Sequence, residues 1–181
     1  MNLDATAVAL GARQSTTANW LAPLSYAAQI WEINTNARLA AFLAQIGYES
    51  MGLQFLSEIW GPTADQLTYE PPSAKATELG NTQKGDGYLF RGRTPIMLTG
   101  RANYVLAAQA LCYDCDTNPD MTLEPSSGAN IAGWYWSTHN CNALADAGNF
   151  EAVTKAINGG LNGYQQRLVR WAAAKQALGV T

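Results

Sequence analysis

Charge is scarce in this 181-residue chain: charged side chains make up 14% of it, against about 25% in an average soluble domain. Lys and Arg total 11 and Asp and Glu total 14, so the net charge is −3. Such a chain lacks the concentrated basic surface with which proteins bind nucleic acid or anionic lipid. We therefore expect no nucleic-acid partner and no stable membrane association.

Long apolar runs are also missing. No window approaches 18 uninterrupted apolar residues, the length that a membrane-spanning helix needs. The first residues, MNLDATAVALGARQ, have neither the basic start nor the apolar stretch of a secretory signal. We therefore expect synthesis in the cytoplasm without a signal peptide.

Cysteine is rare as well, and its odd number argues against a disulfide framework. Cys112-x-x-Cys115 followed by His139-x-Cys141 contains the ligand types of a zinc site, but the second half is an uncommon zinc spacing. A redox function of the CxxC pair would need a βαβ context, which the sequence lacks. We expect free thiols, no metal and no other cofactor.

Apolar residues, by contrast, make up 48% of the chain, enough for a real core. Their helical spacing, together with start and stop signals, predicts a mainly α fold with Asn36 as one N-cap. Gly- and Pro-rich stretches at 60–73 and 80–95 predict loops, with a small β-hairpin at 88–98. The predicted helices cover residues 17–33, 36–49, 101–111, 126–138, 149–158 and 164–178.

Two glutamates stand out near the end of the 36–49 helix. Glu49 lies on the face that carries Ile46, where burial and the negative helix C-terminus both favour a protonated carboxyl group. Glu58 follows nine residues later, and an end of the helix at Met51-Gly52 would let it face Glu49 across a cleft. Two carboxyl groups in different environments suit glycoside hydrolysis. Spacing alone still favours the simpler interpretation, a helix-end residue and a solvated one.

Three motifs in order add a more specific signal. FLAQIGYES, then GDGYLFRGRTPIMLTGRANY, then AINGGLNG with Arg167 downstream resemble the catalytic domain of glycoside hydrolase family 19, and in particular its chitinase-like endolysins from phages and prophages. The resemblance covers roughly residues 38–170. It implies a lysozyme-like, two-lobed α+β fold in which helices dominate. It also implies hydrolysis of β-1,4 bonds between N-acetylated sugars, with inversion.

The resemblance further implies roles for matching residues. Glu49 corresponds to the general acid and Glu58 to the base that activates water. Thr99 stands where the family has a hydroxyl group that helps to position this water. Asn103 and Asn158 correspond to asparagines that bind substrate near the catalytic centre.

Two residues are expected to support these groups. Arg167 resembles an arginine of the inner network, and its charge would keep Glu58 ionised if the two lie close together. Tyr48 replaces the histidine that usually precedes the acid, and Met97 replaces a common glutamine. These two departures from the family pattern affect the expected contacts with sugar more than the expected reaction.

Other interpretations of the same residues remain. Thr99 would also serve as the N-cap of the following helix, and Asn158 before Gly159 would also serve as a helix end. Among the aromatic residues we expect Tyr88 and Phe90 to be those that line the groove and bind sugar, whereas Trp134 is expected to pack in the core.

Taken together, these features predict one catalytic domain over residues 1–181, monomeric and without a separate wall-binding domain. The expected function is a muramidase-type endolysin that binds and hydrolyses peptidoglycan glycan strands, acting on the cell wall after release from the host cytoplasm. A chitinase with the same carboxyl pair is the main alternative. A catalytically inactive glycan-binding module is the second.

Overall fold

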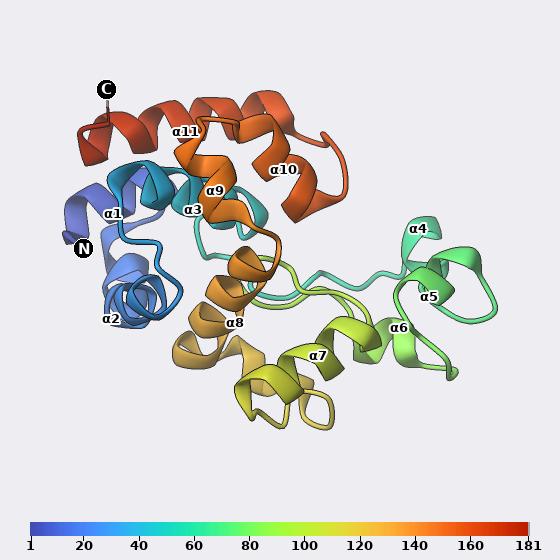
Figure 1. Cartoon of the computed structure of the whole chain (residues 1–181). Helices are drawn as coiled ribbons and strands as arrows, with labels where there is room; N and C mark the ends of the chain where they lie inside the picture. The colour runs from blue at the N-terminus through green and yellow to red at the C-terminus, as the bar shows by residue number, and fades with distance from the viewer. Residues whose placement is uncertain (181) are drawn as a thin grey trace.

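The computed structural model describes residues 1–180, which are helical over most of their length (Figure 1). None of the helices in this part of the chain is both long and apolar enough to cross a membrane. In chain order the helices are α1 (Leu3–Leu10), α2 (Gln14–Ile30), α3 (Asn36–Glu49), α4 (Ala64–Leu67), α5 (Ala74–Glu78), α6 (Asp86–Leu89), α7 (Arg101–Leu111), the 3-10 helix η1 (Pro119–Leu123), α8 (Pro125–Thr138), α9 (Cys141–Asp146), α10 (Phe150–Asn158) and α11 (Tyr164–Leu178).

The mainly α fold class is confirmed. Helices α3, α7 and α11 have the predicted bounds, and the other predicted helices are displaced by at most three residues at either end. The N-cap of α3 is Thr35 rather than Asn36: the Thr35 side chain accepts the N–H of Arg38, while Asn36 donates to the Leu178 carbonyl (2.7 Å). The pattern missed α1, α9 and the short helices, because a few turns show too little periodicity.

The predicted hairpin at 88–98 is reduced to a bridge. Residues 86–89 form the short helix α6, and only Arg93 and Leu98 exchange backbone hydrogen bonds, at 3.0 and 2.7 Å. A second bridge joins Ser57 to Arg93. Three segments, at Ser57, Arg93 and Leu98, thus lie side by side, and the first of them carries the second glutamate.

Helix α3 is the centre of the larger lobe, which α1, α2 and α8–α11 complete (Figure 1). Eight consecutive residues, Ala40–Gly47, are buried, and each large apolar side chain among them stabilises the fold by about 1.5–3 kcal/mol. Gly47 permits the close approach of α1, since a Cβ there would lie 2.4 Å from the Leu10 carbonyl oxygen. This packing fixes the position of Glu49 at the end of α3.

A second core cluster lies under α7 and α8. Phe90, Tyr104, Ile131 and Trp134 belong to it, and Trp134 is packed as expected, with 8% of its surface exposed. Helices α4, α5 and α6 extend from this cluster as a small lobe (Figure 1). The molecule therefore has two lobes of unequal construction, with the residues of interest between them.

The small lobe is fastened to α7 by a buried carboxylate. Asp86 accepts the backbone N–H groups of Thr82 (2.8 Å) and Gln83 (2.9 Å) and forms an ion pair with Arg101, whose Nε lies 2.8 Å away. The Arg101 side chain, followed by the backbone donors, lowers the pKa of Asp86 below its ordinary value.

Candidate active site

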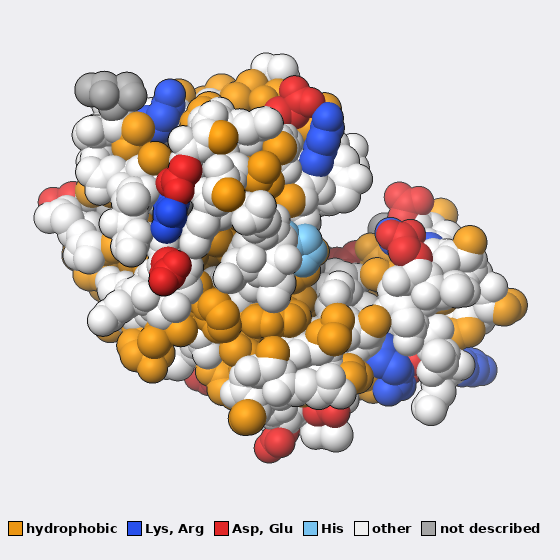
Figure 2. Space-filling model, viewed as in Figure 1, with side chains coloured by type: hydrophobic (Ala, Val, Ile, Leu, Met, Phe, Trp, Pro, Cys, Tyr) orange, Lys and Arg blue, Asp and Glu red, His pale blue; other side chains and the backbone are white. Residues whose placement is uncertain are grey.

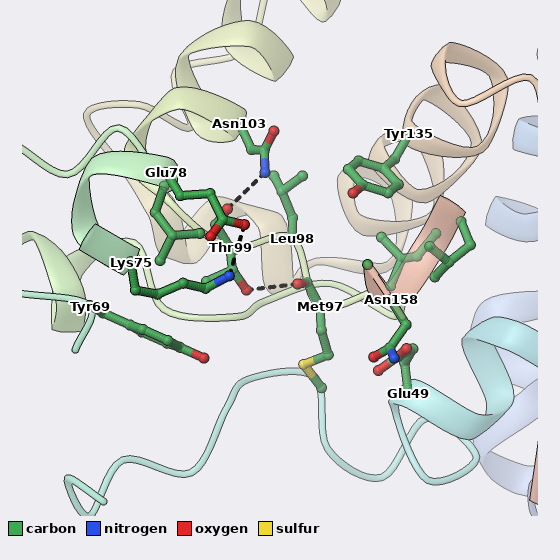
Figure 3. A pocket seen from close by; sticks show the side chains of 14 residues that line it. Glu49, Tyr69, Lys75, Glu78, Met97, Leu98, Thr99, Asn103, Tyr135 and Asn158 are labelled. Atoms are coloured by element: carbon green, nitrogen blue, oxygen red, sulfur yellow. Dashed lines mark hydrogen bonds and ion pairs between the residues drawn. The ribbon is translucent and has the colours of Figure 1, made fainter. Parts of the chain in front are cut away.

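A pocket of about 330 Å³ lies between the lobes, where the molecular surface is visibly hollowed (Figure 2). Glu49 and Asn158 lie on one side of it, and Thr99 and Asn103 lie on the other (Figure 3). Its remaining lining residues are Tyr69, Lys75, Glu78, Leu79, Ile96, Met97, Leu98, Tyr135, Ile157 and Gly159.

Glu49 is held by a buried arginine from the far end of the chain. Its Oε1 lies 2.5 Å from Nη2 of Arg167, and the arginine is 1% exposed. The other guanidinium N–H groups bind the Gln45 side chain (2.5 Å) and the Asn162 carbonyl (3.2 Å). Gln45 in turn donates to Thr154 (2.8 Å). The carboxylate therefore ends a buried network that joins α3, α10 and α11.

The prediction that Arg167 lies close to Glu58 is wrong. The arginine contacts Glu49 and not Glu58, because α11 packs along α3 and brings it to the end of that helix. Tyr48 supports the arginine, whose guanidinium lies 4.2 Å from the centre of the phenol ring. The ring face of Tyr48 therefore makes a cation–π contact with Arg167. The Tyr48 side chain also lines a separate cavity beside Arg170.

Glu58 is held quite differently, by neutral donors that come from loops and a short helix. Its backbone N–H donates to the Gly92 carbonyl (2.8 Å), and Gly92 returns its N–H to Glu58 Oε2 (3.1 Å). The other oxygen, Oε1, accepts from Nε2 of Gln66 (3.0 Å). Each carboxylate oxygen thus has one neutral donor, which orients the group without cancelling its charge.

Thr99 lies near the same carboxylate. A Cβ placed on Gly92 would lie 3.2 Å from Thr99 Oγ1 and 3.5 Å from Glu58 Oε2, so the two oxygens converge on the space beside this glycine. The Thr99 hydroxyl donates to the Met97 carbonyl (2.9 Å), which leaves its lone pairs free to accept from water. The N-cap of α7 is Gly100, so the structure does not use Thr99 as a side-chain cap.

Two asparagines flank this arrangement. Asn103 donates from Nδ2 to the Thr99 carbonyl (2.8 Å), which ties α7 to the Thr99 loop. Asn158 is the last residue of α10, before Gly159 at φ 69°, and it lies beside Glu49 in the pocket (Figure 3). Its Nδ2 is a buried donor that pairs with no acceptor in residues 1–180, and such a donor binds a ligand acceptor without competition.

The predicted sugar-stacking residues lie elsewhere. Phe90 is fully buried against Tyr104, at 5.3 Å between ring centres, so the prediction that it lines the groove is wrong. Residues 86–89 form α6 instead of a hairpin strand, and Phe90 at the C-cap of this helix packs into the second core cluster. Tyr88 is 51% exposed, but it packs with Trp60 and Arg91 outside the pocket, where sugar contact stays a prediction.

Two tyrosines that sequence reasoning missed line the pocket instead. Burial raises the pKa of Tyr69, and the nearby Glu58 and Asp65 carboxylates raise it further. Burial likewise raises the pKa of Tyr135, with smaller effects from Cys141 and Glu49. Both phenols therefore stay neutral donors at physiological pH. No local pattern marks either position.

None of the three cysteines lines the pocket. Cys115 and Cys141 are buried, and burial raises the pKa of these thiols to about 11 and about 12. Cys112 is exposed, and all three are free. Within the part of the chain that the structure describes, no three His, Cys, Asp or Glu side chains gather as a metal site requires.

Comparison with known sequences identifies relatives. The sequence model of a family described as Chitinase class I matches residues 21–153. A Glycosyl hydrolase family 19 domain-containing protein of Haemophilus influenzae is 34% identical over 151 residues, which cover 71% of this chain and 74% of that protein. Acidic endochitinase SP2 of Beta vulgaris is 33% identical over 131 residues, but this chain spans only 43% of its length.

Solved structures have the same fold. Chitinase C from Streptomyces griseus HUT6037 matches with a TM-score of 0.75 at 22% identity, covering 99% of this chain and 77% of its own. A bacterial family 19 chitinase matches with a TM-score of 0.74 at 25% identity, covering 99% and 95%. The two-lobed helical architecture is therefore shared with these enzymes.

Proposed function

This chain belongs to glycoside hydrolase family 19, and from that premise we propose that it is a muramidase-type endolysin that hydrolyses β-1,4 bonds of bacterial peptidoglycan. Family membership makes the chain a chitinase-like glycoside hydrolase. The polymer, the bond and the lytic role after release from the host cytoplasm are the proposed part.

The observation that carries the proposal is the unequal setting of the two glutamates. Glu49 opens into the pocket with a charged partner, Arg167, behind it. Glu58 is oriented by neutral donors and lies near the Thr99 hydroxyl. An inverting glycosidase needs one carboxyl group to protonate the leaving oxygen and another to activate a water.

The proposed reaction assigns each proton. Glu49 donates its proton to the glycosidic oxygen as the bond from the anomeric carbon to this oxygen breaks. A water that donates one hydrogen bond to Thr99 and one to Glu58 attacks the anomeric carbon from the opposite side, and its proton passes to Glu58. Arg167 stabilises the carboxylate that forms on Glu49 as the proton leaves. Solvent then restores both protonation states.

Peptidoglycan is favoured by one feature: the nine-residue interval from Glu49 to Glu58 resembles that of the phage-type enzymes. Lys75 and Glu78 also line the pocket, but their charges are paired with each other (2.9 Å) and do not distinguish a charged polymer from a neutral one. Chitinase activity is the second candidate, because the plant relative and the solved bacterial neighbours are named as chitinases.

Matched gels with embedded peptidoglycan and embedded glycol chitin test this proposal. The wild type is expected to clear the peptidoglycan gel, and Glu49→Gln and Glu58→Gln are expected to clear neither. Clearing of chitin alone would establish the chitinase instead. Binding of glycan by the wild type without any clearing would make the chain an inactive glycan-binding module.

The bond is tested by mass spectrometry of the peptidoglycan digest. We expect muramic acid at the new reducing ends. Glucosamine at those ends would show that the other β-1,4 bond is cut, and a 1,6-anhydro product would show lytic transglycosylation in place of hydrolysis.

A further inference from the structure

The side-chain amide of Gln66 makes all the hydrogen bonds that it can make within the small lobe. The residue is 4% exposed at the start of α4. Its Oε1 accepts the backbone N–H groups of Gly61 (3.2 Å) and Thr63 (2.8 Å). Its Nε2 donates to the Ile59 carbonyl (2.8 Å) and to Oε1 of Glu58 (3.0 Å). No hydrogen-bonding capacity of the amide is left over.

Helix capping explains only half of these contacts. Thr63 and Gln66 form a capping box, in which the Gln66 oxygen accepts the Thr63 N–H and the Thr63 hydroxyl accepts the Gln66 N–H. A glutamate at the same position would cap the helix equally well. The Nε2 group adds nothing to the cap, yet it is aimed at Glu58.

We propose that Gln66 is a positioning residue for Glu58, an inference that rests on the proposed function in which Glu58 is the base. Together with the Gly92 N–H on Oε2, the Gln66 amide holds the plane of the carboxylate from two sides. The remaining lone pairs are thereby directed at the space that Thr99 also faces. A carboxylate held in one orientation stays in the geometry that accepts the proton of water, whereas a freely rotating one does so only part of the time.

The neutrality of the donor matters as much as its position. A cation at residue 66 would form an ion pair with Glu58 and weaken it as a base, whereas an amide donates a hydrogen bond and leaves the charge in place. A carboxylate at residue 66 would disfavour the ionised form of Glu58, because two adjacent carboxyl groups repel each other when both are ionised.

The other ionisable groups around Glu58 supply no cation that pairs with it. Tyr69 faces Glu58 as a neutral phenol and is a further neutral donor on that side, and Asp65 faces Tyr69. Arg91 and Arg93 flank Gly92, but Arg91 donates to the Tyr88 carbonyl and lies over its ring, while Arg93 is paired with Asp120. The Tyr48 and Arg167 pair belongs to Glu49.

Gln66→Glu separates positioning from capping, because it keeps the cap and replaces only the donor. On whichever of purified peptidoglycan and glycol chitin the wild type cleaves, we expect kcat near pH 7 to fall about tenfold or more with KM changed less than twofold. We also expect the acidic limb of the pH–rate profile to move to higher pH by about one unit, since the base must ionise beside a second carboxyl group.

Two further variants complete the experiment. Thr63→Ala weakens the capping box without touching Glu58, so it should lower the melting temperature and leave the acidic limb where it is. Gln66→Met removes donor and cap together, so it should lower both kcat and the melting temperature. Because the pH profile is read from folded enzyme that retains activity, loss of stability cannot imitate the shift.

The outcomes are distinct. A Gln66→Glu enzyme with wild-type kcat and an unmoved acidic limb would overturn the positioning role and leave the proposed function intact. A folded Glu58→Gln enzyme with more than a tenth of wild-type activity would overturn the base itself. A wild type that cleaves neither polymer would overturn the proposed function before Gln66 is tested.

Discussion

The two glutamates lie in regions of opposite construction. Glu49 ends a buried helix, and its partner Arg167 is 118 residues away in sequence, on the last helix of the larger lobe. Glu58 lies in an irregular segment, and its partners Gln66 and Gly92 are 8 and 34 residues away. The first carboxylate is therefore positioned by the packing of a whole lobe, and the second by local loop contacts. Loss of the Glu49–Arg167 pair should therefore cost stability and activity together, whereas loss of the Glu58 carboxylate should cost mainly activity.

The largest effect on the fold is expected from Arg167→Met. Loss of this buried cation leaves Glu49 and Gln45 without their charged donor, which should lower the free energy of unfolding by about 3–5 kcal/mol. Urea denaturation measures the change. Arg38→Met is the matched control, because it breaks a more exposed ion pair with Asp146 and should cost about 1 kcal/mol or less. Equal losses in the two variants would contradict the distinction between the regions.

The largest effect on activity is expected from the glutamates. Glu49→Gln removes the acid and Glu58→Gln removes the base, so each should lower kcat by at least about 100-fold. Glu49→Gln should also lower the melting temperature, since an amide pairs less well with the buried Arg167. Glu58→Gln should leave it nearly unchanged. More than a tenth of wild-type activity in either folded variant would remove that residue from its assigned role.

A smaller loss of stability is expected from Asp86→Asn in the small lobe. The variant keeps the acceptor for Thr82 and Gln83 but loses the ion pair with the partly exposed Arg101, at a cost of about 1–3 kcal/mol. Because the folded-state pKa of Asp86 is lowered, the pair stabilises the fold above the ordinary carboxyl value of 3.8. That stabilisation is lost as pH falls through the lowered value.

Denaturation at several pH values tests the direction in which the Asp86 contribution to stability changes with pH. The difference between wild type and Asp86→Asn should be constant from pH 5 to 8, values taken as about one unit or more above an ordinary carboxyl pKa. It should shrink at lower pH. A difference that grows on acidification would mean that Asp86 is protonated in the folded protein, contrary to the structure.

The smallest effect on activity is expected from substitutions of Thr99. Thr99→Val keeps the shape but removes the hydroxyl that lies near Glu58, so kcat should fall about tenfold, or about 1.4 kcal/mol in barrier height, at similar stability. Thr99→Ser keeps the hydroxyl and should stay close to wild type. Equal kcat for the Val and Ser variants would show that the side chain does not help to position water.

The helices with sustained apolar periodicity were predictable from sequence. Helices α3, α7 and α11 repeat their pattern over 11–15 residues, so their bounds emerge from local information. The short helix α6 does not, and it replaces the start of the expected hairpin at 88–98. Local composition there indicated turns, and the observed conformation is held by buried Asp86 through Arg101 and the backbone N–H groups of Thr82 and Gln83.

The candidate site was predictable only in part. Glu49, Thr99 and Asn158 were found by motif, and the structure places them in one pocket. The partner of Arg167 was not, because it depends on how α11 packs along α3, which no local pattern records. Gln66 had a visible signal, the capping box at 63–66, but that signal concerns the helix and says nothing of the contact with Glu58.

The stereochemistry of the first product tests the central claim most directly. If Glu49 is the acid and Glu58 activates water, the bond breaks by a single displacement, and early-time NMR of the digest should show the new reducing end as the α-anomer, before it equilibrates. If Glu58 instead attacks the sugar as a nucleophile, a covalent intermediate forms and the β-anomer appears first. An initial β-anomer would contradict the division of roles between the two glutamates.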